Sequence, residues 1–387
     1  MTKYTTIFTN LLRPLSRSDF QSVVKGLKGD FRVRTLTCFD LLKSMMYAFV
    51  AGCFSVREIE TSMKVNRKHL YHSGLKAIKR STFCDALEKR SYGVFRRVFY
   101  DLTEKAQVVG AKTNKKFKDP LRIIDATIIP LCLARFDWAK YRKAKGAIKL
   151  HLNMDGDNMI PVDAYITTGN IHEVQQITGL SRESGVIYVM DRGYLDYKSL
   201  YNIELGGSYF VTRMKSNSTH KKVQNNPHKD DGKILSDVLI ELTGPITATY
   251  YPKRLRKVKY HDKETGKTYE FLTNDMERDA EQIAAIYKER WEVELFFKWI
   301  KQNLKIKSFW GTSPNAVQSQ IWAALILTLL LWINKTLDGI TASAHELMIM
   351  MKSSLLVKNS LIGLCTNTMD WKPPNNSCQP LLEGFKC

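Results

Sequence analysis

The spacing of apolar residues along the chain changes near residue 112. Before it, apolar residues recur every three or four positions, as in SRSDFQSVVKGL, FDLLKSMMYAFVAG and SVREIETSM, which predicts short helices. Ser55 and Ser81 are the expected N-caps of two of them. The lysine-rich stretch at 113–120 is typical of a linker. After it, short apolar runs such as LRIIDATIIPL and GVIYVMD are typical of buried strands. The pattern predicts a helical region followed by an α/β region.

The α/β region shows alternating strand and helix patterns. AIKLHLNM and MIPVDAYITT flank the turn-rich DGDN, which predicts a hairpin with Pro161 on an edge strand. A short helix over 172–180, the strand GVIYVMD, the helix LDYKSLYNIEL and the strand SYFVTRMK follow. This order predicts a mixed sheet flanked by helices. Residues 216–278 interrupt it as a β-rich insertion.

The C-terminal third is again helical. One long helix is predicted from 279 to about 304, with Asp279 and Gln282 as a capping box, followed by helices near 315–335 and 343–357 and a loosely ordered tail. The apolar run at 321–333 is shorter than the roughly 20 residues of a membrane span and predicts a buried core helix. The expected domains are a helical DNA-binding domain (1–115), a catalytic core (116–215 plus 279–310), a β-rich insertion (216–278), and C-terminal helices with a tail (311–387).

Charge changes this picture. The chain carries a net charge of +21, and residues 1–120 hold 24 Lys and Arg against 10 Asp and Glu. Such a basic domain usually meets a polyanion, either nucleic acid or an anionic membrane surface. Without a membrane segment or signal peptide, nucleic acid is the favoured partner. The seven cysteines show no C-x-x-C spacing, which argues against a zinc site or disulfide framework and fits a reducing cytosol.

The segment YKERWEVELFFKWIKQNL combines a core face with a polar stripe. On a helical wheel Tyr287, Arg290, Glu294 and Lys301 share an arc of about 60°, with Lys298 beside them. The alternative is a surface helix with i,i+4 ion pairs, each worth a few tenths of a kcal/mol. However, the stripe borders the core face, and it carries more cations than its single carboxylate neutralises. Both features favour an external anion.

Two aspartates stand in apolar strands. Asp125 lies in RIIDATII, and Asp191 ends VIYVMD. A buried carboxylate is costly unless it is paired or binds a metal, and ligands gather at the carboxyl ends of strands in open α/β sheets. Each could instead cap a turn or pair with a neighbouring arginine. Together with a helix glutamate they could hold Mg²⁺ ions, and two such ions clamp both oxygens of an in-line phosphoryl transfer.

These residues resemble a known family. The spacing Y-x2-R-x3-E-x6-K is met by Tyr287, Arg290, Glu294 and Lys301, and with LRIIDATIIPL and VIYVMDRGY it is similar to the YREK signature of bacterial DDE-type insertion-sequence transposases. The resemblance covers about residues 10–335. It implies a ribonuclease-H-like core in which Asp125, Asp191 and Glu294 are the catalytic ligands of two Mg²⁺ or Mn²⁺ ions. The DNA contacts that it implies or that position suggests are Tyr287, Arg290, Lys301, Lys298, Arg192, Arg213 and Lys215.

The resemblance also implies cut-and-paste chemistry. Water cleaves the phosphodiester at the element end, and the freed 3′-OH attacks target DNA, without a covalent enzyme intermediate. The implied partners are double-stranded DNA, as terminal inverted repeats and as target, and a second copy of the chain in a dimeric synaptic complex. The expected location is the bacterial cytoplasm, at the nucleoid, with no membrane partner. Two alternatives remain: a nuclease of the same fold without strand transfer, and an inactive or domesticated protein that only binds DNA ends.

Some features depart from the family or compete with this interpretation. Relatives stack an extruded base on a Trp of the insertion, whereas residues 216–278 contain no Trp. The aromatic substitutes available there are Tyr250, Tyr251, Tyr260 and Tyr269, because base stacking tolerates any aromatic ring. His151 and His172 could lie near the metal site, but a solvated or backbone-bonded histidine is the simpler expectation. Asp155 and Asp157 are expected in a hairpin turn and not in a calcium loop.

Overall fold

The computed structural model describes residues 5–111, 116–142, 145–169, 183–228, 232–304, 306 and 308–366. The predicted helix over 172–180, His172 and the tail after residue 366 lie outside these residues, as does part of the predicted linker. The chain forms two compact units. Unit 1 comprises Met1–Thr113, Ile129–Ala147 and Leu295–Cys387; unit 2 comprises Asn114–Ile128 and Ile148–Glu294.

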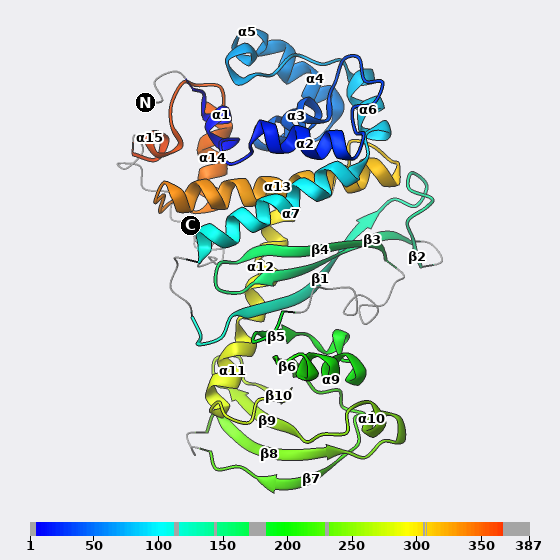
Figure 1. The fold of residues 1–387 in the computed structure, drawn as a ribbon, viewed down its shortest axis with the longest axis vertical. Coiled ribbons are helices and arrows are strands. Elements are labelled where there is room, and N and C mark those ends of the chain that lie inside the picture. Colours follow the sequence, from blue (N-terminus) through cyan, green and yellow to red (C-terminus); the bar gives the residue numbers. More distant parts are fainter. Residues whose placement is uncertain are drawn as a thin grey trace. The chain divides into compact units, whose positions relative to one another are not determined.

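Unit 1 is mainly helical and is organised around one long apolar helix. That helix, α13 (Pro314–Leu337), packs along α7 (Tyr92–Gly110), with the rings of Phe99 and Trp322 5.3 Å apart (Figure 1). The other helices that lie wholly in the unit are α1 (Ile7–Leu11), α2 (Arg17–Gly26), α3 (Cys38–Ala51), α4 (Val56–Val65), α5 (Arg67–Leu70), η1 (Tyr71–Ser73), α6 (Arg80–Lys89), α14 (Ala344–Ser354) and α15 (Leu361–Thr366). The predicted N-terminal helical region is therefore confirmed.

Helix α13 is long and apolar enough to cross a membrane, but 94% of its apolar window is buried inside the structure. Two of its buried amide side chains donate hydrogen bonds within the unit. Gln320 accepts from the Trp310 amide and donates to the Ser308 carbonyl, while Asn334 donates to the Leu11 carbonyl. Buried polar groups satisfied in this way belong to a protein core. The predicted core helix at 321–333 is confirmed.

The two predicted N-caps have different outcomes. Ser55 caps α4, its hydroxyl accepting from the Glu58 amide at 3.2 Å. Ser81 does not cap α6, so that prediction is wrong. The Phe83 amide bonds to the Lys79 carbonyl, which makes Lys79 the N-cap and places Ser81 inside the first turn. Lys79 offers no side-chain acceptor, and the first amides of α6 therefore lack a side-chain cap.

Unit 2 contains most of a mixed sheet flanked by α9 (Tyr197–Leu205), α10 (Pro245–Tyr250) and α11 (Ala280–Lys288) (Figure 1). The strands are β1 (Leu121–Leu131), β2 (Lys140–Arg142), β3 (Lys145–Asp155), β4 (Ile160–Thr168), β5 (Ile187–Met190), β6 (Tyr209–Arg213), β7 (His220–Asn225), β8 (Ile234–Leu242), β9 (Leu255–Asp262) and β10 (Lys267–Thr273). Neighbouring strands of the sheet follow the order β3-β1-β5-β6-β10-β9-β8-β7, and β4 pairs with β3. The short strand β2 pairs with the start of β3, in unit 1. This confirms the predicted α/β fold class.

The pairing of the strands separates two parts of this sheet. β1, β5 and β6 are parallel, whereas β10, β9, β8 and β7 extend it antiparallel from β6. The insertion is thus β-rich as predicted, and it continues the sheet. The predicted hairpin is β3 and β4, and Pro161 lies on its outer strand, where a missing amide is tolerated.

The predicted long helix after residue 279 is two helices. α11 ends at Lys288, Glu289 follows as its C-cap, and α12 (Arg290–Asn303) begins directly after it. The sequence has neither Gly nor Pro at this point, so the break gave no signal. The expected capping box is also wrong, because Asp279 is the N-cap residue but its side chain caps no amide.

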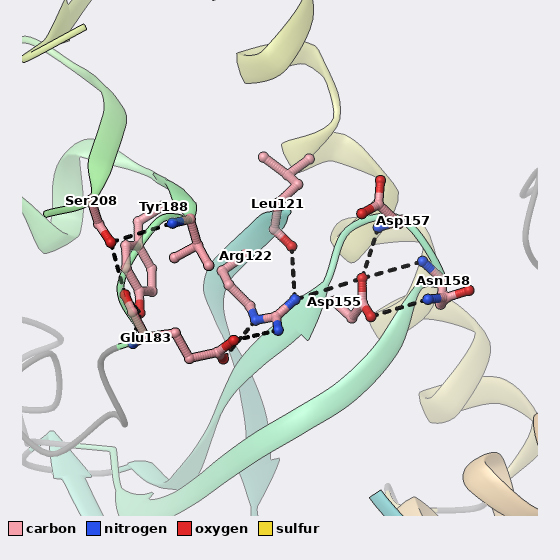
Figure 2. A network of polar contacts seen from close by, with 9 residues as sticks. Leu121, Arg122, Asp155, Asp157, Asn158, Glu183, Tyr188 and Ser208 are labelled. Carbon is pink, nitrogen blue, oxygen red and sulfur yellow. Dashed lines mark hydrogen bonds and ion pairs between the residues drawn. The ribbon is translucent and has the colours of Figure 1, made fainter. Parts of the chain in front are cut away.

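A polar network ties the β3–β4 hairpin to β1 (Figure 2). The Arg122 guanidinium donates to both carboxylate oxygens of Glu183, at 2.8 and 2.6 Å, and lies 3.7 Å from Asp155. Asp155 in turn accepts from the amides of Asp157 and Asn158, which closes the hairpin turn. The prediction of a turn in place of a calcium loop agrees with this geometry.

Candidate active site

The sheet register places Asp125 and Asp191 side by side. Ile124 pairs with Met190 across the parallel strands β1 and β5, and each aspartate is the next residue of its chain. Asp191 directly follows the last residue of β5, at the strand's carboxyl end. Ligand sites of open α/β sheets form at such ends.

Helix α12 brings a third carboxylate into the same group through Arg290. The Arg290 guanidinium donates to Asp125 Oδ2 at 2.8 Å and to Glu294 Oε1 at 2.7 Å. Arg290 and Asp125 are largely buried, whereas the Glu294 side chain is 57% exposed. Arg290 Nε has no hydrogen-bond partner within the described residues. One buried cation therefore bridges a strand carboxylate and a helix carboxylate, without satisfying all its own donors.

Burial and mutual repulsion act on these carboxylates. Burial raises the pKa of Asp125 to about 6; Arg290 opposes this shift, and the charges of Glu294 and Asp191 add to it. Negative charges that raise the pKa of a neighbouring carboxyl must lie close to it. The three acidic groups predicted from the sequence thus interact electrostatically around Arg290.

Tyr287 lies near the end of α11 and is almost fully buried. Its ring lies 4.6 Å from that of Phe271 on β10, and its hydroxyl donates to Asp191 Oδ1 at 3.3 Å. Burial raises its pKa to about 12, so the phenol stays protonated and serves as a hydrogen-bond donor. The helix break separates Tyr287 from Arg290 and Glu294. Even so, Tyr287 contacts Asp191, and Arg290 contacts both Asp125 and Glu294.

The other predicted DNA-contacting cations are distributed around the fold. Lys298 is exposed and Lys301 half-buried, both on the part of α12 that belongs to unit 1. Arg192 is exposed in η2 (Arg192–Tyr194). The Arg213 guanidinium lies 5.4 Å from the Tyr269 ring centroid, and Lys215 donates to the Leu195 carbonyl. Within the described residues of unit 2, Arg192, Arg213 and Lys215 form no ion pair or hydrogen bond with the three carboxylates.

The lesser candidate His151 is a buried structural residue. Its two ring nitrogens lie 3.2 Å from the Tyr194 hydroxyl and 3.1 Å from the Thr167 hydroxyl. Burial lowers its pKa to about 4, which keeps the ring neutral near pH 7. The expectation of a solvated or backbone-bonded side chain is corrected, because side-chain hydroxyls hold it.

No partner of Trp291, the second residue of α12, could be predicted from the sequence. Its ring makes an edge-on contact with Tyr269, 6.3 Å between centroids, and Tyr269 stacks on Phe271 at 6.0 Å. Of the four tyrosines considered for base stacking, Tyr251 is buried and bonded to Glu204, while Tyr250 is 45% exposed. An aromatic cluster thus lies next to Tyr287. It was missed because Tyr269 and Trp291 are 22 positions apart, on different elements.

The donor chemistry of the carboxylate group fits a hard divalent cation. Asp and Glu oxygens are the ligands that Mg²⁺ prefers, and a cation, Arg290, already stands between two of them. Within the described part of the chain, however, no three His, Cys, Asp or Glu side chains are grouped closely enough to hold a metal. The residue types therefore fit, and two of the three carboxylates are bonded to Arg290 in this structure.

Comparison with known proteins decides the family. A family model described as a transposase DDE domain matches residues 116–330. The chain belongs to the DDE transposase family. Residues 3–76 also match a family described as a domain of unknown function. The matched family together with the mixed sheet confirms the predicted ribonuclease-H-like fold class.

Three bacterial relatives support the assignment. A Sinorhizobium fredii protein named as a transposase is 37% identical over 66% of this chain and 72% of its own length. Two proteins named as insertion-sequence transposases are each 28% identical. The one from Geobacillus stearothermophilus matches over 86% of this chain and 85% of its own length, and the one from Synechocystis over 81% and 88%.

Proposed function

We propose that this DDE transposase cleaves the ends of an insertion sequence and joins the 3′-OH ends to target DNA. The observation that carries the proposal is the register that sets Asp125 beside Asp191, with Glu294 linked to Asp125 through Arg290. We assign Asp125, Asp191 and Glu294 as the ligands of two Mg²⁺ or Mn²⁺ ions. When bound, such ions activate the attacking oxygen and stabilise the leaving oxygen of an in-line displacement.

Arg290 changes its partner in this proposal. In the free protein its guanidinium neutralises Asp125 and Glu294, and its Nε is unsatisfied. Guanidinium groups bind phosphate oxygens as readily as carboxylates. Arg290 therefore moves from the carboxylates to a phosphate at the DNA end, which frees two anionic side chains for the metal. This exchange explains why the three carboxylates do not form a metal-ready group in the free protein.

The remaining residues position DNA. Tyr287 stays protonated and donates to Asp191, which holds that carboxylate beside the cleavage point. Lys298, Lys301, Arg192, Arg213 and Lys215 supply phosphate contacts. The ring of Tyr269, which carries Arg213 on one side and meets Trp291 at its edge, provides the aromatic surface for a displaced base. Two copies of the chain act together on paired inverted repeats, in the bacterial cytoplasm at the nucleoid.

The test incubates the full-length protein with linear DNA that carries its own element ends, with and without Mg²⁺. We expect metal-dependent cleavage that Asp125→Asn, Asp191→Asn or Glu294→Gln reduces to background. Glu241→Gln, a surface carboxylate of β8 paired with Lys221 and Arg254, serves as the control and keeps full activity.

The products separate the alternatives. Ends joined to a target plasmid indicate a transposase, whereas cleaved but unjoined ends indicate a nuclease. Binding of ends without cleavage indicates a domesticated protein. Cleavage that survives any of the three carboxylate substitutions contradicts the metal assignment.

A further inference from the structure

Unit 1 contains a cleft of about 670 Å³ that none of the proposed catalytic residues line. Four separate stretches form it: the start of α4, the start of α6, the end of β1 with the segment after it, and residues 308–310. Its charged lining residues are three arginines, Arg57, Arg80 and Arg135, and it has no acidic lining residue. We call it the arginine cleft.

The charges of the three arginines are not neutralised within the described part of the chain. All are exposed, and within the described residues none of their guanidinium groups forms an ion pair or hydrogen bond. Two arginines of the same unit do form ion pairs, Arg13 with Asp338 and Arg97 with Asp101. Three like charges around one hollow repel one another, and a bound anion would relieve that repulsion.

The cleft also contains two kinds of hydrogen-bond donor that lack an acceptor: the first amides of a helix and an indole N–H. Helix α6 begins in its wall without a side-chain cap and without an acidic residue in its first turn. The amides at such a helix start bind anions such as phosphate. Trp310 lines the cleft and is only 6% exposed, and its indole N–H has no partner within the described residues. A buried donor left unsatisfied is costly unless a ligand completes it.

Aromatic rings form a further part of the lining. Phe54, at the entrance to α4, is 56% exposed although it is a large apolar residue. Phe136 and Phe309 contact each other with ring centroids 6.2 Å apart. Cations for phosphates together with exposed rings for bases are the combination that binds single nucleic-acid strands. The volume lies within the roughly 300–1,000 Å³ usual for small-ligand sites, which suits nucleotides better than an intact duplex.

We infer that the arginine cleft binds a short stretch of DNA strand, with its phosphates on Arg57, Arg80 and Arg135 and a base against Phe54. The inference rests on the proposed function, because that function makes DNA the polyanion. It gives the N-terminal region, for which the matched family has no assigned role, a site outside the catalytic centre.

A cysteine in the cleft allows a direct test. Cys132 is an exposed, free thiol of the lining, whereas the half-buried Cys365 on α15 lies elsewhere in the unit. The full-length protein is alkylated with N-ethylmaleimide at increasing oligonucleotide concentrations, and peptide mass spectrometry follows each thiol. We expect saturating DNA to slow alkylation of Cys132 at least fivefold and to leave Cys365 unchanged.

The oligonucleotides identify the source of the strand. A duplex with the element end, a duplex of unrelated sequence, a single strand and a mononucleotide are compared, with binding followed by fluorescence anisotropy. Protection by the element end alone indicates a terminal strand, and equal protection by the unrelated duplex indicates target DNA. Bound DNA that leaves Cys132 unprotected overturns the inference but not the transposase proposal. Absence of any DNA binding overturns both.

A matched pair of variants provides a second measure. We compare the triple variant Arg57→Gln, Arg80→Gln, Arg135→Gln with Arg17→Gln, Arg34→Gln, Arg67→Gln, three exposed arginines of the same unit outside the cleft. The cleft triple should reduce the slope of log affinity against log salt by about 2–3, since each lost phosphate contact removes about one. Equal slopes in the two triples overturn the inference.

The aromatic contact has its own readout. A single strand containing 2-aminopurine should lose fluorescence on binding wild type and keep it on binding Phe54→Ala, because stacking quenches the base. Unchanged quenching in the variant removes Phe54 from the site.

Discussion

Unit 2 holds two buried arginines that each bridge a pair of carboxylates, and they differ in how completely they are bonded. Arg122 donates through Nε and Nη2 to Glu183 and through Nη1 to the Leu121 carbonyl, beside Asp155. Arg290 donates to Asp125 and Glu294 but leaves Nε unsatisfied, and Glu294 is mostly exposed. A fully bonded arginine fixes structure, whereas an incompletely bonded one is free to exchange partners. We therefore propose that Arg122 serves stability and that Arg290 serves the reaction.

The two arginines should differ in their contribution to stability. Arg122→Met should lower the free energy of unfolding by about 3 kcal/mol, because it removes the cation beside the largely buried Asp155 and both guanidinium bonds to Glu183. Arg290→Met should cost only about 1–2 kcal/mol, since Glu294 is hydrated and Asp125, with a pKa near 6, takes up a proton at modest cost. Urea unfolding of both variants measures this. Equal losses would contradict the proposed division of roles.

Activity should show the opposite order. Arg290→Met should lower end cleavage about 100-fold, the usual consequence of removing one positioned donor from a phosphoryl-transfer site. Arg122→Met, compared at equal folded fraction and low temperature, should stay within twofold of wild type. Single-turnover cleavage of labelled ends provides the measurement. A cleavage defect in both variants would mean that the Arg122 network also supports the reaction.

The sequence predicted one arginine site and missed the other, for physical reasons. Apolar runs on both sides of Asp125 and Asp191 identify strands, and the strand pairing then places the two aspartates together. The wheel grouped Tyr287, Arg290 and Glu294 on the assumption of one continuous helix, and the break at Glu289 follows no local signal. The Arg122–Glu183 bond joins residues 61 positions apart. Contacts at that separation depend on tertiary packing and leave no periodic pattern in the chain.

A pH series sharpens the comparison at Asp125. Its pKa is about 6 in the folded protein against 3.8 for the free side chain, so its ionised form is disfavoured by folding. Relative to Asp125→Asn, wild type should therefore lose stability as the pH rises from about 4 to about 6, by about 2–3 kcal/mol, and stay level above. Chemical unfolding of both proteins from pH 4 to 8 tests this. A stability difference that stays constant with pH would show that burial does not raise the pKa of Asp125.

The smallest expected effect concerns metal affinity without DNA. Arg290→Met removes the cation that competes for Asp125 and Glu294, so Mn²⁺ should bind about fivefold more tightly than to wild type, about 1 kcal/mol. Electron paramagnetic resonance of free Mn²⁺ measures it independently of cleavage, with Arg122→Met as the unchanged control. Loss of binding in Asp125→Asn identifies the site. Equal affinity in Arg290→Met and wild type would exclude competition by the guanidinium.

The pairing of Ile124 with Met190 restricts how this gene can change over time. Side chains alternate across a strand, so inserting or deleting one codon between Leu121 and Asp125 would turn the aspartate to the opposite face of the sheet. Substitutions that preserve apolar character can accumulate in β1 and β5, but length changes there cannot. Copies of the element that lose activity by short insertions or deletions should include many altered in these two strands, while the turn at 263–266 between β9 and β10 absorbs length variation without loss.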